Sequence, residues 1–328
     1  MKKSLIIIAL FVCCISFAQK QKTVNIIFDT DIAPDYDDVG AMALLHAFED
    51  MGEAKLLATI SCNAFETTAP TLSVLNTYFN RPGIPIGITK KAWPNKDCSQ
   101  QWAQAIVAKY PHVLKSNSEA IEAVALYRKI LSAQPDNSVT IVSVGFFTNL
   151  AGLLGSNADE YSKLGGKDLI IKKVKQLISM AARLDKDSVS GYEFNVMVDA
   201  HASQKVFAEW PTPVIISGFE IGEKVLTGIR LINNEALQNS PVKDAFAVAL
   251  ARDKNTLGRN SWDQTAVLVA VRGMEPYFGY RKLNFEVKDD GKNVIIPGKK
   301  FTYLTFKQTP EKIEKVIEDL MMHLPAKQ

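Results

Sequence analysis

The sequence has few cysteines and no strong excess of charge of one sign. Only 4 of its 328 residues are cysteine, too few to staple a chain of this length, so its stability must come from an apolar core. Its 38 basic and 35 acidic residues nearly balance, and nothing indicates a nucleic-acid-binding surface. The sequence also lacks internal repeats and Pro-, Gly- or Ser-rich linkers, which favours one domain over several.

Histidine is equally scarce. The sequence holds four histidines, none at metal-ligand spacing and none beside a nucleophile. We therefore interpret them as surface or structural groups, and the candidate ligands must be sought among oxygen-bearing side chains.

Long apolar runs are absent except at the N-terminus. There Lys2 and Lys3 precede an apolar run from Leu5 to Phe17, and a small-residue site ends at Ala18. This is the pattern of a secretory signal peptide, and the run is shorter than the ~20 residues that cross a bilayer. We predict a signal peptide at residues 1–18, one domain at residues 19–328, export to the periplasm or the extracellular space, and no stable membrane insertion after cleavage. Removing the signal leaves two cysteines, Cys62 and Cys98, which either pair or stay as thiols.

Short runs rich in Val and Ile alternate with longer segments of helical period. Strands are expected at 24–28, 56–60, 139–144, 176–180 and 213–217, and helices at 39–49, 67–78, 119–131, 148–154 and 200–209. This order predicts an α/β fold with a mostly parallel open sheet flanked by helices. After Tyr280, short strands at 282–287, 294–296 and 301–305 and a helix at 310–324 are expected to form a small C-terminal β/α appendage of the same domain.

The densest chemical signal is the segment from Asp29 to Asp38, which places five carboxylates within ten residues after the first strand. Ligands of open α/β sheets bind beyond the carboxyl ends of strands, and crowded carboxylates need a cation or hydrogen bonds to compensate them. Oxygen ligands suit Ca²⁺ or Mg²⁺. An EF-hand is excluded, because Pro34 and Gly40 stand where that loop needs Gly and Glu. The start Asp29-Thr30-Asp31 also resembles phosphohydrolases of the haloacid dehalogenase type, which usually have Thr or Val at the position of Ala33.

Five segments in one order make a different resemblance more specific. They are Asp29-Thr30-Asp31 with Asp37-Asp38, then Asn63 at the end of the second strand, Val144-Gly145-Phe146-Phe147-Thr148-Asn149, Glu193-Phe194-Asn195, and Trp262-Asp263. Together they resemble the motifs of inosine-uridine preferring nucleoside hydrolases. Any one of these motifs alone would be weak, but the ordered set spans most of the chain.

The resemblance implies a calcium site. Asp31, Asp38 and Asp263 would ligate Ca²⁺ through their carboxylates, Thr148 would add its backbone carbonyl, and Asp29 would support the metal loop. Asp31 would also take the proton from the attacking water, so that the oxygen attacks C1′ of an oxocarbenium-like transition state.

The resemblance also implies a ribose site. Its members would be Asp37, Asn63, Glu193 and Asn195. Because polar groups left unpaired by a missing hydroxyl cost about 1 to 3 kcal/mol each, such a site favours ribose over deoxyribose.

The acidic loop departs from the family pattern in length. Asp31 and Asp37 are six residues apart where the shorter family motif has four. We assign the pair Asp37-Asp38 to the site because the apolar helix follows it at once, which leaves Asp35 beside the site or facing solvent. Ala33 stands where Gly is often found, so we expect no positive φ there.

A second departure concerns the leaving group. Trp262 stands where several family members have a His that acts as general acid, and Trp cannot donate a proton in that way. Two interpretations stay open: Trp262 stacks on the departing base and assists catalysis, or it packs at the start of a core helix. A counterpart of the family's second sugar-binding Asn is not evident, and Asp187 is a weaker candidate for that role.

From these observations we predict a calcium-dependent hydrolase that releases ribose and a free base from a nucleoside or another N-riboside. The rivals are a Mg²⁺-dependent phosphohydrolase with Asp29 as nucleophile, and a non-catalytic calcium-stabilised sugar or nucleoside receptor. The sequence leaves the base preference open, and a homo-oligomer is compatible with it.

Overall fold

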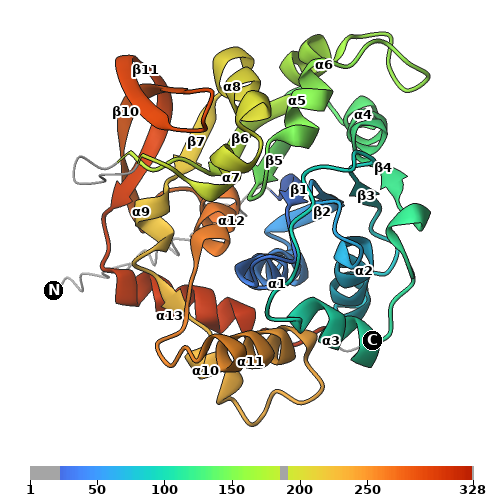
Figure 1. The fold of residues 1–328 in the computed structure, drawn as a ribbon, viewed down its shortest axis with the longest axis vertical. Helices are drawn as coiled ribbons and strands as arrows, with labels where there is room; N and C mark the ends of the chain where they lie inside the picture. The colour runs from blue at the N-terminus through green and yellow to red at the C-terminus, as the bar shows by residue number, and fades with distance from the viewer. Residues whose placement is uncertain (1–22, 185–190, 327–328) are drawn as a thin grey trace, which may run out of the picture.

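The computed structural model describes residues 23–184 and 191–326, and its framework is a nine-stranded sheet (Figure 1). The strand order is β10-β11-β7-β6-β5-β1-β2-β3-β4, with all neighbours parallel except the antiparallel pair β10 and β11. The strands are β1 Val24–Thr30, β2 Ala54–Ser61, β3 Ile86–Ile88, β4 Ile121–Glu122, β5 Val139–Ser143, β6 Val174–Met180, β7 Val214–Ser217, β10 Phe278–Val287 and β11 Asn293–Phe306. A separate antiparallel pair joins β8 (Leu226–Thr227) to β9 (Arg259–Asn260). The predicted α/β class with a mostly parallel sheet is confirmed.

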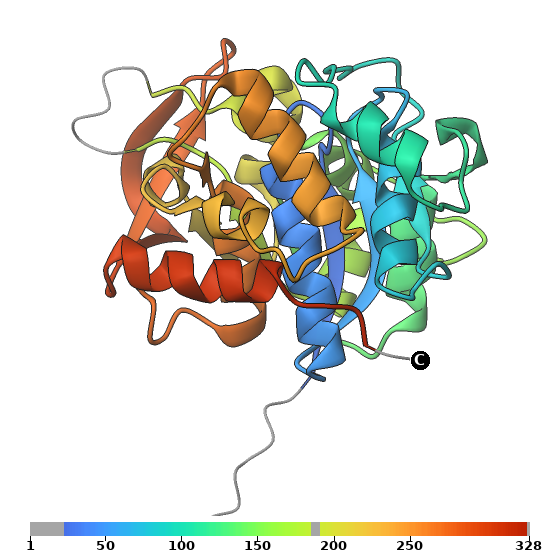
Figure 2. The same ribbon diagram turned by 90° about the horizontal axis from the view of Figure 1, so that it is seen from below.

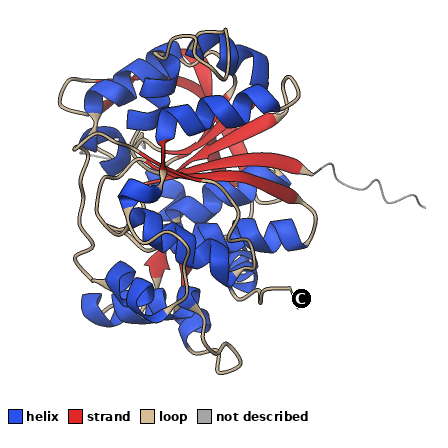
Figure 3. Ribbon diagram, turned by 90° about the vertical axis from the view of Figure 1, so that its right-hand side faces the viewer, coloured by secondary structure: helices blue, strands red, loops and turns tan. Residues whose placement is uncertain are grey.

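Helices cover both faces of the sheet, which Figure 3 shows between two helical layers. Helices α1, α2, α3, α11, α12 and α13 contribute to one apolar cluster, and α4, α5, α6 and α8 contribute to the other. The helices are α1 Asp37–Asp50, α2 Thr68–Tyr78, α3 Trp102–Lys109, α4 Ala123–Ala133, α5 Thr148–Leu154, α6 Gly166–Lys173, α7 Phe194–Val198, α8 Ala200–Glu209, α9 Phe219–Gly222, α10 Ile229–Ile232, α11 Pro241–Asp253, α12 Trp262–Arg272 and α13 Pro310–Met321.

Side-chain alternation along the central strands divides the core between the two faces. In β1, Ile26 and Phe28 belong to the cluster under α1 and α12, whereas Ile27 belongs to the cluster under α4 and α5. Successive residues of a strand point to opposite faces, so a strand covered on both sides is apolar at every position. This is why the central strands form continuous Val- and Ile-rich runs.

The C-terminal region continues the main sheet. Strand β11 pairs in parallel with β7 through Thr302 opposite Ile215 and Tyr303 opposite Ile216, and α13 contacts α1 (Figure 2). Phe301 lies with its ring centroid 5.8 Å from that of Phe207 on α8. The segment described above as a small appendage therefore extends the edge of the sheet, because its aromatic side chains complete the core over α8.

Most predicted bounds differ from the observed ones by a few residues, and two differences change an element's start or number. The helix expected at 119–131 begins at Ala123, because Glu122 is extended and its side chain accepts a hydrogen bond from the N–H of Ala125 at 2.8 Å. The two strands expected at 294–296 and 301–305 form one strand, β11.

Cys62 and Cys98 are both buried free thiols. Among the described residues, none of the helices has the length and apolar character needed to span a membrane, and the signal peptide predicted at residues 1–18 lies outside those residues.

The topology identifies where a ligand site belongs. Strand β1 pairs with β2 on one side and with β5 on the other. The chain thus winds outward in one direction from β1 to β4 and in the other from β5 to β7. Ligands of open α/β sheets bind beyond the strand ends where the order reverses, and here this switch point lies beside the end of β1.

Candidate active site

A cavity with an empty volume of about 530 Å³ opens at this switch point. Its walls come from the loop after β1, the ends of β5 and β6, and the starts of α1, α7, α9 and α12. The lining residues are Asp31, Asp35, Asp37, Asp38, Val144, Met180, Glu193, Phe194, Asn195, Phe219, Arg259, Trp262 and Asp263.

The acidic loop is held by the residue between its first two aspartates. The hydroxyl of Thr30 donates a hydrogen bond to Asp38 and accepts one from the N–H of Ile32 at 3.1 Å. Ala33 follows with φ of 150° and is fully buried, so the expectation that this position has no positive φ was wrong. The turn that brings Asp31 and Asp38 together imposes this backbone conformation on Ala33, at a cost of order 1–3 kcal/mol.

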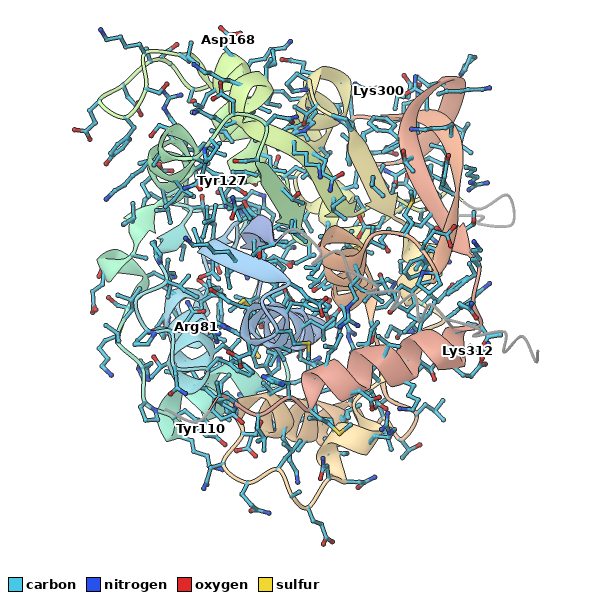
Figure 4. All side chains as sticks on the ribbon, turned by 180° about the vertical axis from the view of Figure 1, so that it is seen from behind. Arg81, Tyr110, Tyr127, Asp168, Lys300 and Lys312 are labelled. Carbon is cyan, nitrogen blue, oxygen red and sulfur yellow. The ribbon has the colours of Figure 1, made fainter. Side chains whose placement is uncertain are left out.

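Asp29 lies below the loop and supports it. It is fully buried, and its carboxylate accepts hydrogen bonds from the hydroxyl of Tyr127 at 2.7 Å and from the amide of Asn149 at 3.2 Å. Figure 4 labels Tyr127, which α4 supplies. Burial raises the pKa of Asp29 to about 7, although these hydrogen bonds oppose the shift. Asp29 is thus joined to α4 through Tyr127 and to α5 through Asn149, at the start of the acidic loop.

Three carboxylates converge in the cavity. Oxygen atoms of Asp37, Asp38 and Asp263 all lie within 4.8 Å of one another, and Asp31 lines the same cavity. Burial, followed by the charges of neighbouring aspartates, raises the pKa of Asp31, Asp38 and Asp263 well above the ordinary value. So many buried carboxylates in one place require positive charge to compensate them.

Arg259 supplies part of that charge, and no sequence motif identified it. Its guanidinium group forms ion pairs with Asp35 at 2.7 Å and Asp37 at 2.9 Å, and it lies 4.9 Å from the ring centroid of Trp262. Burial opposes the charged form, but Asp37 and Asp35 outweigh burial and raise the pKa of Arg259. One arginine against this many carboxylates leaves a deficit of positive charge.

The donor set fits a hard divalent cation. Buried Asp38 Oδ2 has no hydrogen-bond partner among the described residues, and all the convergent side chains offer oxygen, as Ca²⁺ and Mg²⁺ require. Thr148, predicted to offer its backbone carbonyl, is not among the residues that line the cavity; it begins α5, and its hydroxyl donates to Asp199 at 2.5 Å. Val144, four residues earlier, lines the cavity instead.

Glu193 and Asn195 lie on the opposite wall of the cavity from α1. Glu193 caps α7 and accepts hydrogen bonds from the N–H groups of Asn195 at 2.9 Å and Val196 at 3.1 Å. Burial raises the pKa of Glu193 to about 7 against these bonds. The amide of Asn195 donates to the carbonyl of Val144 at 2.9 Å. Both predicted sugar-binding residues therefore reach the cavity in fixed orientations.

Asn63 does not line the cavity. Its side-chain amide donates to the carbonyls of Asp31 at 3.0 Å and Lys96 at 2.8 Å, and its Oδ1 accepts from the N–H of Lys96 at 2.9 Å. These contacts with the backbone occupy the fully buried Asn63. In this structure Asn63 fastens the loop around Lys96 to the acidic loop.

Aromatic rings form the remaining wall. Trp262 packs against Phe219 with ring centroids 5.1 Å apart, and its indole N–H donates to the carbonyl of Phe219 at 2.9 Å. Phe194, from α7, also lines the cavity. Trp262 thus begins core helix α12 and faces the cavity at the same time, and its polar atom is already used. Asp187 lies outside the described residues.

The fold and this cavity define an α/β enzyme that binds a small polar ligand beside a cluster of carboxylates. The chain belongs to the inosine-uridine preferring nucleoside hydrolase family, which it matches over residues 26–316. Members of this family are metal-dependent N-glycosyl hydrolases, so ribonucleoside hydrolysis is the general activity that family and fold support.

Solved structures of the same fold agree with this assignment. An inosine-uridine preferring nucleoside hydrolase from Bacillus anthracis is 15% identical, with a TM-score of 0.69 over 92% of this chain and 99% of that chain. A purine-preferring ribonucleoside hydrolase from Gardnerella vaginalis is 16% identical, with a TM-score of 0.67 over 91% and 99%. The type III effector protein XopQ, solved with adenosine diphosphate ribose, is 14% identical, with a TM-score of 0.67 over 92% and 94%. No curated protein matches this sequence.

Proposed function

We propose that the protein is an exported, calcium-dependent hydrolase that cleaves the N-glycosidic bond of ribonucleosides to give ribose and a free base. The observation that carries the proposal is the cluster of Asp37, Asp38 and Asp263, whose carboxylate oxygens lie within 4.8 Å of one another in a cavity that Glu193 and Asn195 also line. Binding of adenosine diphosphate ribose by a protein of the same fold supports a ribose derivative as the ligand.

Asp31, Asp38 and Asp263 would hold the calcium ion, with the carbonyl of Val144 in the place that the resemblance gave to Thr148. Bound calcium supplies positive charge that favours ionisation of an attacking water molecule. Asp31 accepts the proton of that water. Asp31 is suited to this role by position, because it follows β1 directly and lines the same cavity as Asp38 and Asp263.

Three other side chains of the cavity lining hold the sugar. Asp37, Glu193 and Asn195 face the cavity with oxygen and nitrogen atoms that match ribose hydroxyls. Glu193 is fixed by backbone N–H groups on α7, so its carboxylate is oriented before substrate binds. Pre-orientation lowers the entropic cost of holding the sugar in position for attack at C1′.

Departure of the base takes place without a histidine in the cavity lining. The rings of Trp262 and Phe219, whose planes are tilted by 35°, form an apolar side of the cavity against which a purine or pyrimidine packs. Because the indole N–H of Trp262 is bonded to Phe219, Trp262 acts through stacking and exclusion of water.

The proposal is tested by release of reducing sugar from a panel of ribonucleosides by the protein lacking residues 1–18, with and without a calcium chelator. Sugar release that the chelator abolishes and added calcium restores is the expected result. Binding of nucleosides without release of sugar from any of them would show a receptor instead of a hydrolase. Sugar release that continues unchanged in chelator would remove the metal from the mechanism.

A further inference from the structure

Two cations lie over aromatic rings that line the cavity. The ammonium group of Lys96 lies 5.9 Å from the ring centroid of Phe194 and 4.7 Å from that of Trp93. The guanidinium group of Arg183 lies 4.3 Å from the ring centroid of Phe219. Phe194 is 39% exposed and Trp93 is 54% exposed, so Lys96 lies where the cavity meets solvent.

Neither cation has an acidic partner among the residues that the structure describes. Among residues 23–184 and 191–326, no carboxylate forms an ion pair with Lys96 or Arg183. The Nε atom of Arg183 is buried and has no hydrogen-bond partner within the same part of the chain. Arg259, in contrast, forms ion pairs with Asp35 and Asp37, which compensate its charge. Lys96 and Arg183 thus keep charge and hydrogen-bond donors available for a ligand.

Buried asparagines fix the backbone of both cations. Asn63 binds the N–H and the carbonyl of Lys96 and also the carbonyl of Asp31, which ties Lys96 to the acidic loop. The side chain of Asn293 accepts a hydrogen bond from the N–H of Arg183 at 3.0 Å. Residues held in this way have a defined position relative to the cavity, unlike lysines and arginines on free surface loops.

The charge of the cavity therefore changes from inside to outside. The interior carries carboxylates, which suit a cation and neutral hydroxyl groups. Next to the aromatic rings of its lining, Phe194 and Phe219, lie two cations, Lys96 and Arg183, that form no ion pair within the described part of the chain. A ligand that fits both parts has a neutral sugar at one end and a negative charge at the other.

We propose that the substrate is an N-riboside with a negatively charged group at the end that projects from the cavity, where Lys96 and Arg183 bind it. This inference rests on the proposed function. The charge has two sources, an acidic group on the base or a phosphate on the 5′ carbon of the ribose, and both offer oxygen atoms to ammonium and guanidinium donors.

The test compares three substrates in five forms of the protein. The substrates are uridine, 5-carboxyuridine and uridine 5′-monophosphate, which separate a charged base from a charged sugar. The proteins are wild type, Lys96→Met, Arg183→Met, the double variant, and Lys129→Met on the exposed side of α4 as a control for loss of a lysine. Methionine keeps an unbranched apolar side chain against the ring and removes the charge together with its hydrogen-bond donors.

We expect wild type to hydrolyse one of the two charged substrates with a kcat/KM about 10-fold above that for uridine, as one charge-assisted hydrogen bond provides. The Lys96→Met and Arg183→Met variants should each lower this preference, and the double variant should abolish it, whereas uridine turnover changes by less than about 2-fold. Salt at 0.5 M should weaken the preference because the rim is open to solvent. Preference for 5-carboxyuridine locates the charge on the base, and preference for the monophosphate locates it on the sugar.

Equal kcat/KM for all three substrates, or a preference that survives in the double variant, would overturn the inference while leaving the hydrolase function intact. If none of the three is hydrolysed, the proposed function fails, and calorimetric binding of the same compounds to the calcium-loaded protein decides the inference separately. Tighter binding of a charged compound to wild type than to the double variant would uphold the anionic site. Equal binding by both proteins would exclude it.

Discussion

The floor and the outer wall of the cavity are built from opposite kinds of side chain on different kinds of support. The floor consists of buried aspartates at the end of β1 and in the first turns of α1 and α12, such as Asp31, Asp38 and Asp263. The wall consists of aromatic rings on the short helices α7 and α9 and at the start of α12, such as Phe194, Phe219 and Trp262. The sheet and two core helices thus position the reactive groups, and short local elements shape the space for the rest of the substrate.

The largest effect is expected from Asp38→Asn, which removes one carboxylate from the cavity floor. This change removes one charged oxygen ligand and leaves the volume of the side chain unchanged, so calcium affinity should fall at least 100-fold and kcat/KM about 10³-fold. Calcium titration by calorimetry and sugar-release kinetics check the two values. The matched control is Asp35→Asn, because Asp35 has a 41% exposed side chain paired with Arg259. Normal calcium affinity in Asp38→Asn would remove Asp38 from the metal site.

Arg259→Met tests the residue that contacts both Asp37 on the floor and Trp262 on the wall. The change leaves Asp37 buried without its cation, so the free energy of unfolding of the metal-free protein should fall by about 2 kcal/mol. This loss is smaller than the loss on breaking a fully buried ion pair, because Asp35, the other partner of Arg259, is partly exposed. Calcium should reduce this loss because it supplies positive charge to the same carboxylates. Urea denaturation with and without calcium measures both values, with Arg259→Lys as the charge-retaining control. An equal loss in both conditions would show that Arg259 stabilises the protein independently of the metal site.

The floor could be predicted in large part from the sequence, because the strand that ends at Thr30 and the helix that begins at Asp37 set the places of its aspartates. Two predicted site residues, Asn63 and Thr148, do not line the cavity, because their side chains bind residues that are distant in the chain. Asn63 turns to the backbone of Lys96, and Thr148 turns to Asp199. Neither contact follows from local pattern, since both partners arrive from separate elements.

Arg259 was missed for the same reason. It lies in β9, and its partner Asp37 is 222 residues away in the sequence. The crowding of five carboxylates did predict that a cation or hydrogen bonds must compensate them, but nothing near Arg259 in the sequence identified it as a partner. The unexpected φ of Ala33 likewise follows from closure of the acidic loop, which a list of neighbouring residues does not reveal.

The stability of the metal-free protein should depend on pH through its buried carboxyl groups, among them Asp29 and Glu193, which lie outside the cluster of Asp37, Asp38 and Asp263. Burial raises the pKa of Asp29 and Glu193 to about 7 in the folded state, above their ordinary values near 4. A raised folded pKa means that the unfolded state releases its proton first, so the contribution to stability is complete below about pH 4 and is lost as pH rises through 7. The melting temperature should fall by about 5 °C between pH 5 and pH 8. Glu193→Gln should flatten this slope, and a melting temperature that rises over the interval would contradict the assignment.

Trp262→His tests the effect of adding a general acid, which the aromatic wall lacks. A histidine at this position introduces a titrating group with an ordinary pKa near 6.5 beside the departing base. We expect about 10-fold higher kcat for nucleosides with poor leaving groups and a new alkaline decline of kcat near that pKa. Trp262→Phe is the control, because it keeps an aromatic ring and loses the hydrogen bond to the carbonyl of Phe219. If both variants lose activity equally, the indole ring itself is what catalysis needs at this place.

The smallest effect is expected from Tyr127→Phe, which disturbs the support of the floor and leaves the cavity unchanged. The Tyr127 hydroxyl donates to buried Asp29 at 2.7 Å, so its loss should cost about 1 kcal/mol of unfolding free energy. Tyr110 donates to Asp244 at the same distance, but Asp244 is 31% exposed, so Tyr110→Phe should cost less (Figure 4). Because Tyr127 lowers the pKa of Asp29, its removal should also raise that pKa further and steepen the loss of stability with rising pH. Turnover should change by less than about 3-fold, since Asp29 does not line the cavity. A much larger loss of turnover at unchanged stability would place Asp29 among the reacting groups instead of beneath them.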